Sequence, residues 1–146
     1  MKNILGLDPG NCTGYALVNA LGDLIIYGEI NIKKEEKQMA FLFSAINDLL
    51  RSLKPDLCVI EAIFVNPLNG KTTLRLCELR GVLVTCCELN HIPYISYAPT
   101  VIKKVICGRG NAKKSEIKKK FNISSHNICD AIAIAKTYTI LNPIKP

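Results

Sequence analysis

The sequence has no tryptophan, only two histidines, and no hydrophobic run close to the ~20 residues needed to cross a membrane. The N-terminus also lacks a long apolar segment behind a basic start, so no secretory leader is expected. The seven cysteines include no CxxC pair and no Cys/His cluster at zinc spacing. These absences predict a soluble, cytoplasmic type of protein without membrane partners, whose cysteines are reduced and act as small buried hydrophobes.

Length and charge narrow the class of protein further. A chain of 146 residues can bury one core, so we expect a single domain spanning residues 1–146. Lysine and arginine total 19 against 12 aspartate and glutamate, which gives a formal net charge of +7. This balance favours an anionic partner such as nucleic acid, although it does not establish one.

The order of hydrophobic runs predicts a mixed α/β sheet with helices on both faces. Three antiparallel strands are expected first, followed by alternating strands and helices. The expected strands are 4–7, 13–18, 24–31, 57–61 and 94–97, and the expected helices are 38–52, 71–90, a segment between Pro99 and Gly108, 113–121 and 128–141.

Three acids follow this pattern. Asp8 ends the first strand before Pro9-Gly10, Glu61 ends the buried fourth strand, and Asp130 stands near the start of the last helix. If the first and fourth strands are parallel neighbours, Asp8 and Glu61 meet at one edge of the sheet, and Asp130 joins them when the helix packs across that edge. Carboxylates gathered in this way suit Mg²⁺ or Mn²⁺, and two such ions about 4 Å apart support phosphodiester hydrolysis.

In order and spacing, these and neighbouring residues resemble the RuvC family of Holliday junction resolvases, which has a ribonuclease H-like fold. The resemblance covers nearly the whole chain. Its motifs are residues 5–10 with 13–15, 60–61 with Phe64, 79–81, 97–98 with Lys103, 108–110 with 114–115, and 129–135.

The resemblance implies a homodimer that resolves four-way DNA junctions by paired, symmetric nicks, with branch-migration proteins as further partners. It assigns the catalytic, metal-binding carboxylates to Asp8, Glu61 and Asp130, with two Mg²⁺ ions per active site for which Mn²⁺ substitutes. It further implies that Phe64 meets the junction bases. The basic residues that it places near the scissile phosphate are Lys103 and Lys114.

A basic segment around these lysines provides further candidates for phosphate contacts. Lys104, Arg109 and Lys113 lie in it beside a glycine-rich loop that can approach a DNA backbone closely. A solvated face is the alternative interpretation of this segment. Phe64 likewise has the alternative of a core position, but its loop follows a candidate catalytic strand, which favours exposure.

One position departs from the family. Members have a fourth metal-site residue three positions before the last acid, usually Asp and sometimes His, whereas this chain has Asn127 there and His126 one residue earlier. An asparagine carbonyl can bind Mg²⁺ but supplies no charge, and His126 shares a helical face with Asp130. Alternatively, Asn127 is the N-cap of the last helix, with Asp130 at its third position. The segment 121–128 is also shorter than the usual connection of the family.

Three other functions compete with junction cleavage. The opening motif also resembles the first phosphate loop of actin-like ATPases and sugar kinases, but those proteins need two such domains. A ribonuclease H-like RNA-processing nuclease is a closer alternative. The neutral Asn127 also leaves open a protein that binds junctions with weak or no cleavage. A viral or phage origin would change the expected location from the cytoplasm to the site of viral DNA replication.

Overall fold

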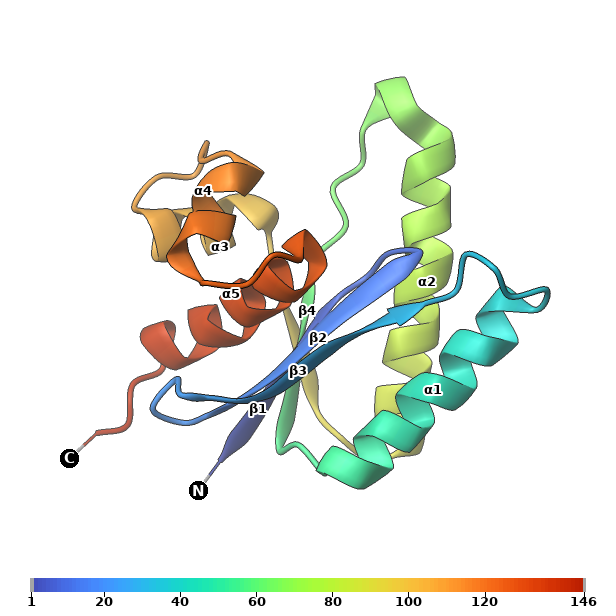
Figure 1. The fold of residues 1–146 in the computed structure, drawn as a ribbon, viewed down its shortest axis with the longest axis horizontal. Helices are drawn as coiled ribbons and strands as arrows, with labels where there is room; N and C mark the ends of the chain where they lie inside the picture. The colour runs from blue at the N-terminus through green and yellow to red at the C-terminus, as the bar shows by residue number, and fades with distance from the viewer. Residues whose placement is uncertain (1, 146) are drawn as a thin grey trace.

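A computed structural model describes residues 2–145 of the chain (Figure 1). Its strands form one sheet in the order β3-β2-β1-β4-β5. The first three strands pair antiparallel, whereas β4 pairs parallel with both β1 and β5. The strands are β1 (Asn3–Asp8), β2 (Cys12–Asn19), β3 (Leu24–Asn31), β4 (Leu57–Glu61) and β5 (Tyr94–Tyr97). The helices are α1 (Gln38–Leu53), α2 (Gly70–Leu89), α3 (Pro99–Cys107), α4 (Lys114–Lys120) and α5 (His126–Leu141), with a 3-10 turn η1 (Pro67–Asn69) before α2.

Helices cover both faces of the sheet, as the sequence predicts. The pair α1 and α2 packs on one face, and α3, α4 and α5 pack on the other (Figure 1). Alternate residues of the central strands enter the two cores: Leu7 and Ile60 face α1 and α2, while Ile4 and Val59 face α5. The central strands β1 and β4 are therefore buried on both sides, which explains their nearly continuous apolar sequences.

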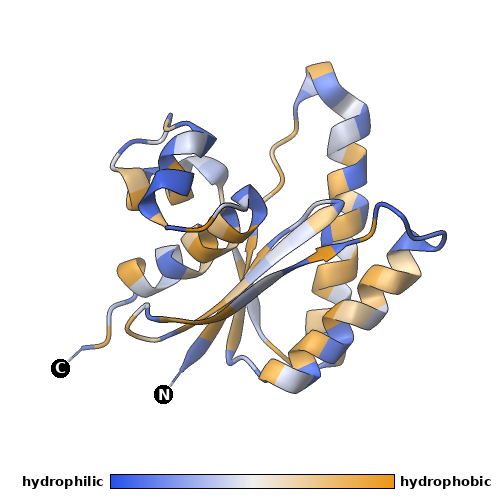
Figure 2. Cartoon of the chain, viewed as in Figure 1, coloured by the Kyte–Doolittle hydropathy of each residue, from blue (hydrophilic) through white to orange (hydrophobic). Residues whose placement is uncertain are grey.

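Hydrophobic residues concentrate along the sheet and on the sides of the helices that face it (Figure 2). The loop between β3 and α1 is hydrophilic (Figure 2). Over residues 2–145, no helix has the length and apolar character needed to cross a membrane.

Proline and glycine bound α3 where the sequence predicts. Pro99 is its first residue, where a missing backbone N–H costs no hydrogen bond. Gly108 caps the other end with φ of 84°, and its N–H donates to the Lys104 carbonyl at 2.9 Å. This left-handed conformation favours glycine and turns the chain sharply toward α4.

The last helix begins earlier than expected. Helix α5 starts at His126 rather than at residue 128, and the Ser125 hydroxyl is its N-cap, accepting a hydrogen bond from the Ile128 N–H at 3.3 Å. The alternative that Asn127 caps this helix is therefore wrong, and Asp130 lies in the second helical turn. The segment 124–127 contains three residues of types that cap helices well, so the sequence pattern alone does not select one.

The cysteines are all free, but not all are buried as expected. The four buried cysteines are Cys58, Cys86, Cys87 and Cys129. Cys12 and Cys107 are half-buried, and Cys77 is exposed on the side of α2 that faces away from the sheet. The sequence prediction was wrong at Cys77 because α2 carries apolar residues on its outer side as well, such as Leu74, which is 67% exposed.

Two glycines of the sheet, Gly6 and Gly14, lie directly beneath the backbone of α5. We call this pair the glycine seat. A Cβ atom on Gly6 would lie 2.2 Å from the Ala131 carbonyl oxygen, and one on Gly14 would lie 2.0 Å from the Asn127 carbonyl oxygen. Both distances are far below van der Waals contact, and both neighbours are backbone atoms that cannot rotate away. The helix therefore approaches the sheet as closely as it does because β1 and β2 have no side chain at these two positions.

We predict that Gly6→Ala destabilises the fold whereas Gly70→Ala does not. The methyl group of Gly6→Ala would force α5 away from the sheet, at an expected cost of about 1–3 kcal/mol. Gly70 is the first residue of α2 and has nothing within 4 Å of its Cβ position, so Gly70→Ala should leave the free energy of unfolding unchanged or raise it by up to about 1 kcal/mol through helix propensity. Urea denaturation of both variants measures these changes, and equal stability of the two would contradict the seat assigned to Gly6.

Candidate active site

The ends of β1 and β4 bring the first two candidate acids together. These strands are parallel, with Leu7 opposite Ile60, so Asp8 and Glu61 are the next residues at the same edge of the sheet. Their carboxyls lie close enough for each to shift the pKa of the other. The sequence prediction that these two acids meet is confirmed by this register.

The third acid, Asp130, reaches the same edge from α5. Its carboxyl lies close enough to raise the pKa of both Asp8 and Glu61. The approach depends on the glycine seat, because Ala131, which follows Asp130, contacts the position where a Gly6 side chain would be. One helix and two strands therefore place three carboxyls together from positions far apart in the sequence.

Burial raises the pKa of all three acids, and like charge adds to the shift at Asp8 and Glu61. The pKa of Asp8 is raised well above its ordinary value, first by burial and then by the charges of Glu61 and Asp130. Burial is also the main reason for the raised pKa of Glu61 and of Asp130. In their ionised forms, the three carboxylates therefore need compensating positive charge.

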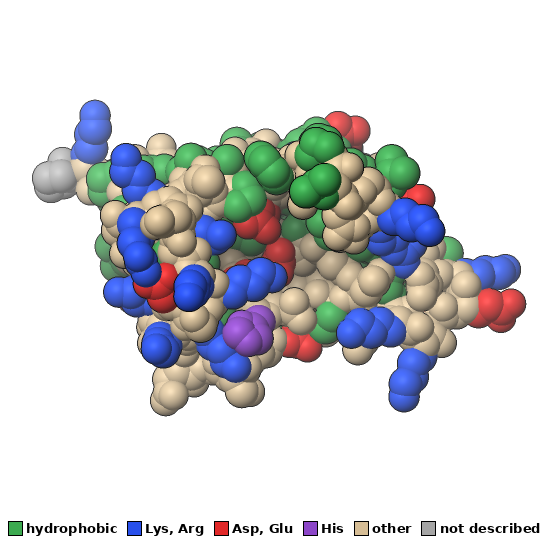
Figure 3. Space-filling model, turned by 90° about the horizontal axis from the view of Figure 1, so that it is seen from above, with side chains coloured by type: hydrophobic (Ala, Val, Ile, Leu, Met, Phe, Trp, Pro, Cys, Tyr) green, Lys and Arg blue, Asp and Glu red, His purple; other side chains and the backbone are tan. Residues whose placement is uncertain are grey.

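Two of the predicted lysines supply part of that charge. The Nζ atom of Lys114 lies 3.8 Å from the Oδ2 atom of Asp130. Lys103, half-buried on α3, also lowers the pKa of Glu61 and Asp130. Figure 3 shows acidic side chains in a hollow surface, with lysine and arginine side chains and a histidine around one side of it. Lys114 remains largely exposed, with 74% of its side chain accessible, so it is available to bind a phosphate.

The other predicted basic residues are not gathered at the acids. Arg109 forms an ion pair with Glu116, and the Lys113 backbone N–H donates to the same carboxylate. Glu116 therefore fastens the glycine-rich loop to α4 and offsets the charge of Arg109. Lys104 is exposed on α3, and its carbonyl oxygen accepts the hydrogen bond from Gly108.

Phe64 lies in the loop that leaves β4 toward α2, and its side chain is 76% exposed. The alternative of a core position is therefore wrong. Val65 and Leu68 in the same segment are 68% and 96% exposed. The sequence prediction missed these two neighbours, which make the segment between β4 and α2 an exposed apolar loop; Figure 1 shows this segment rising from the end of β4.

His126 and Asn127 differ in their surroundings. His126 is exposed on the first turn of α5 and lies close enough to Asp130 to lower the pKa of that acid. The Asn127 side chain lies instead near the Cys12 thiol group, whose pKa it lowers. In the structure, Asn127 is therefore engaged with the start of β2, whereas His126 remains open to solvent beside the site.

A link between β3 and α5 escaped sequence analysis. Glu29 accepts hydrogen bonds from the Ser125 hydroxyl and from the Cys12 thiol, the latter at 3.2 Å. It therefore joins the N-cap of α5 to the strands beneath it. The hydrogen bond to Ser125 spans 96 residues of sequence, and no local pattern signals so distant a pair.

Comparison with known proteins identifies the family. A family model described as Crossover junction endodeoxyribonuclease RuvC matches residues 4–138. The chain is 34% identical over 145 residues to the crossover junction endodeoxyribonuclease RuvC of Ehrlichia chaffeensis, covering 90% of this chain and 92% of that protein. It is 31% identical over 154 residues to that of Brachyspira hyodysenteriae, covering 96% of this chain and 95% of that protein.

Solved structures agree on the fold. RuvC of Thermus thermophilus superimposes with a TM-score of 0.81 at 19% identity, covering 94% of this chain and 93% of that chain. A structure of that protein in complex with a Holliday junction substrate also gives a TM-score of 0.81 at 19% identity, with coverage of 97% and 94%. The predicted ribonuclease H-like fold is thereby confirmed. Since the family model spans nearly the whole chain, the protein belongs to the RuvC family.

Proposed function

We propose that this protein is a crossover junction endodeoxyribonuclease that cuts four-way DNA junctions. The observation that carries the proposal is the meeting of Asp8, Glu61 and Asp130 at one sheet edge, with raised pKa values and lysines beside them. Relatives that match most of the chain are crossover junction endodeoxyribonucleases by name. A protein of the same fold has been solved with a Holliday junction substrate. Residues 1–146 act as one nuclease domain in this proposal.

The donor set fits divalent cations of the Mg²⁺ and Mn²⁺ type. Within residues 2–145, no group of three or more His, Cys, Asp and Glu side chains already has the spacing of a metal-ligand set. The charge of Asp130 nevertheless raises the pKa of Asp8 and of Glu61, and each of the three carboxyls offers the oxygen ligands that these ions prefer. A cation between them would remove the repulsion that now favours protonation. We therefore assign two ions to Asp8, Glu61 and Asp130.

The residues around the carboxyls have separate tasks in this proposal. When bound, a pair of divalent ions activates a water and stabilises the leaving oxygen of a phosphodiester. Lys114 and Lys103 hold the negative charge of the scissile phosphate against the acidic edge. Phe64 presents its exposed ring to the bases of the junction, on which aromatic side chains stack without sequence preference.

Paired symmetric nicks require two active sites, so we propose that the protein acts as a homodimer. The outer side of α2 supports a self-complementary contact, because it exposes Leu74, Cys77 and Gly81 in successive turns. Apolar and small residues of this kind permit close packing of two helices. A branch-migration partner remains an expectation from the family, and we assign no surface to it.

Binding with weak cleavage is the second candidate function. It is favoured by Asn127, which occupies the fourth metal-site position without a charge and whose side chain is engaged with Cys12. The exposed imidazole of His126 lies near Asp130 and offers a neutral nitrogen ligand in its place. Cleavage of RNA rather than DNA is the remaining alternative, and parallel assays on the two substrates separate them.

The first prediction concerns stability and metal. A carboxyl whose pKa is raised on folding stabilises the protein while protonated, and this contribution is lost as pH rises from its ordinary value of 3.8 through the raised one. In EDTA at neutral pH, Asp8→Asn should therefore raise Tm by about 3 °C or more, since each pKa unit corresponds to about 1.4 kcal/mol. Added Mg²⁺ should stabilise the wild type and raise its Tm above that of Asp8→Asn.

Asp48→Asn is the matched control for this experiment, because Asp48 is exposed on α1. Its Tm should follow that of the wild type with and without Mg²⁺. A lower Tm for Asp8→Asn in EDTA, or a difference insensitive to Mg²⁺, would contradict the assigned repulsion.

The second prediction separates cleavage from binding. Asp8→Asn and Glu61→Gln should each reduce nicking of a four-way junction to background, because each removes a metal-binding charge. Binding of the same junction should survive, because the basic surface is intact. The measurement pairs a gel assay of a labelled junction with a matched linear duplex and uses Asp48→Asn as the active control. Retained nicking in either site variant would refute the assignment of the acids.

The third prediction tests the fourth position. Asn127→Asp should lower the Mg²⁺ concentration for half-maximal nicking, because it adds a carboxylate beside Asp130. Asn142→Asp, at the far end of the same helix, is the charge-matched control and should leave the midpoint unchanged. His126→Ala raises the midpoint if its imidazole replaces the missing ligand. Superimposable Mg²⁺ and Mn²⁺ titrations for all variants would show that neither position touches the metal site.

A further inference from the structure

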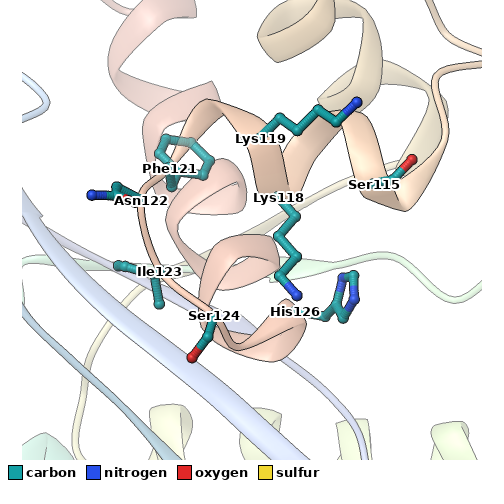
Figure 4. Close-up of a pocket in the computed structure, with 8 residues that line it drawn as sticks. All are labelled: Ser115, Lys118, Lys119, Phe121, Asn122, Ile123, Ser124 and His126. Atoms are coloured by element: carbon teal, nitrogen blue, oxygen red, sulfur yellow. The ribbon is translucent and has the colours of Figure 1, made fainter.

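A hollow with a volume of about 840 Å³ lies between α4 and the start of α5 (Figure 4). Its size is within the range of sites that hold small molecules. The hollow is lined by Ser115, Lys118, Lys119, Phe121, Asn122, Ile123, Ser124 and His126. Hydroxyl, amide and cationic groups thus surround two apolar side chains, and none of the eight lining residues is acidic.

Lys118 is the central cation of the hollow. Its half-buried side chain points toward His126, whereas that of Lys119 points away (Figure 4). The ion pairs formed among residues 2–145 include neither Lys118 nor His126. A lysine that forms no ion pair among these residues and lies beside an imidazole suits an anionic ligand.

The hollow adjoins the candidate active site along α5. His126 on its rim and Asp130 among the acids are four residues apart, so they lie on one helical face about 6 Å apart along the helix axis. Successive nucleotides of one DNA strand are separated by a rise of about 3.4 Å along the helix axis. A strand that has its scissile phosphate at the acids and runs along α5 would reach the hollow within about two nucleotides of the cut.

The apolar wall fits the uncharged part of a nucleotide. Phe121 and Ile123 are half-buried and line the hollow beside the hydroxyls of Ser115 and Ser124. Lys136 lies 5.8 Å from the centroid of the Phe121 ring and fixes this ring by a cation-π contact. Cationic groups beside an aromatic platform are the usual means of holding a nucleic-acid strand.

We propose that this hollow binds one phosphate of the cleaved DNA strand, within two nucleotides of the cut, through Lys118 and His126. The attached nucleoside packs against Phe121 and Ile123. The inference rests on the proposed function, because it requires a DNA strand at the acidic edge. It adds a second anchoring point, so that the scissile phosphate is positioned by its neighbour as well as by Lys114.

A scan with neutral phosphates tests the proposal. A series of four-way junctions is prepared, each with a single methylphosphonate at a different position of the cut strand. The affinity of each junction is measured for the wild type and for Lys118→Ala. At one position within two nucleotides of the cut, the wild type should lose about threefold to tenfold in affinity, whereas Lys118→Ala should lose nothing further. Lys120→Ala, a lysine of the same helix outside the hollow, should behave as the wild type at every position.

The outcome separates this proposal from the proposed function. If every methylphosphonate weakens the wild type and Lys118→Ala by the same factor, Lys118 holds no phosphate and the proposal fails, even when the unmodified junction is nicked. If the wild type nicks no junction but shows the expected loss at one position, the proposed cleavage fails and the binding site stands. An abasic site at that nucleotide should also weaken wild-type binding, and unchanged affinity would refute the contact with Phe121 and Ile123.

Discussion

The close approach of α5 to the sheet is the constraint on which the site depends. The helix lies against β1 and β2 at Gly6 and Gly14, where any side chain would collide with helix backbone. This contact sets the height of Asp130 above the ends of β1 and β4. A displacement of the helix by the width of a methyl group would separate the third carboxyl from the other two. The glycines are thus as important to the site as the acids that they position.

The grouped carboxyls carry an energetic cost that the fold does not offset by itself. Burial raises the pKa of Asp8, Glu61 and Asp130, like charge adds to the shift at Asp8 and Glu61, and the two neighbouring lysines compensate only in part. Such perturbed groups concentrate at functional sites, because chemistry needs charge where stability opposes it. In our account, divalent cations complete the charge balance, and the basic surface of α4 brings the DNA strand to them.

Much of the fold follows from sequence patterns, because its elements are marked locally. Strand β4 and the ends of α3 lie where the apolar run, Pro99 and Gly108 predict them. Parallel pairing of β1 with β4 then brings Asp8 and Glu61 together. Sequence patterns fail where contacts between distant segments determine the local structure. The N-cap Ser125 is fixed by Glu29 on a distant strand, and the exposure of Cys77 follows from an α2 surface that is apolar on two sides.

The fourth position of the site shows the same limit. Sequence comparison identifies Asn127 as a departure but does not reveal that its side chain contacts Cys12. Only the packing of α5 on β2 creates that contact. It also leaves His126 between the acids and the hollow lined by Lys118, so that one short segment serves both regions.

The most direct test of the central claim is the position of Mn²⁺ in a crystal of the protein, located by its anomalous scattering. Our account predicts Mn²⁺ peaks within coordination distance of Asp8, Glu61 and Asp130, which disappear in crystals of Asp8→Asn. Well-ordered crystals soaked with Mn²⁺ that show no peak among these carboxyls, or peaks that persist without Asp8, would contradict the assignment of the sheet edge as the metal site.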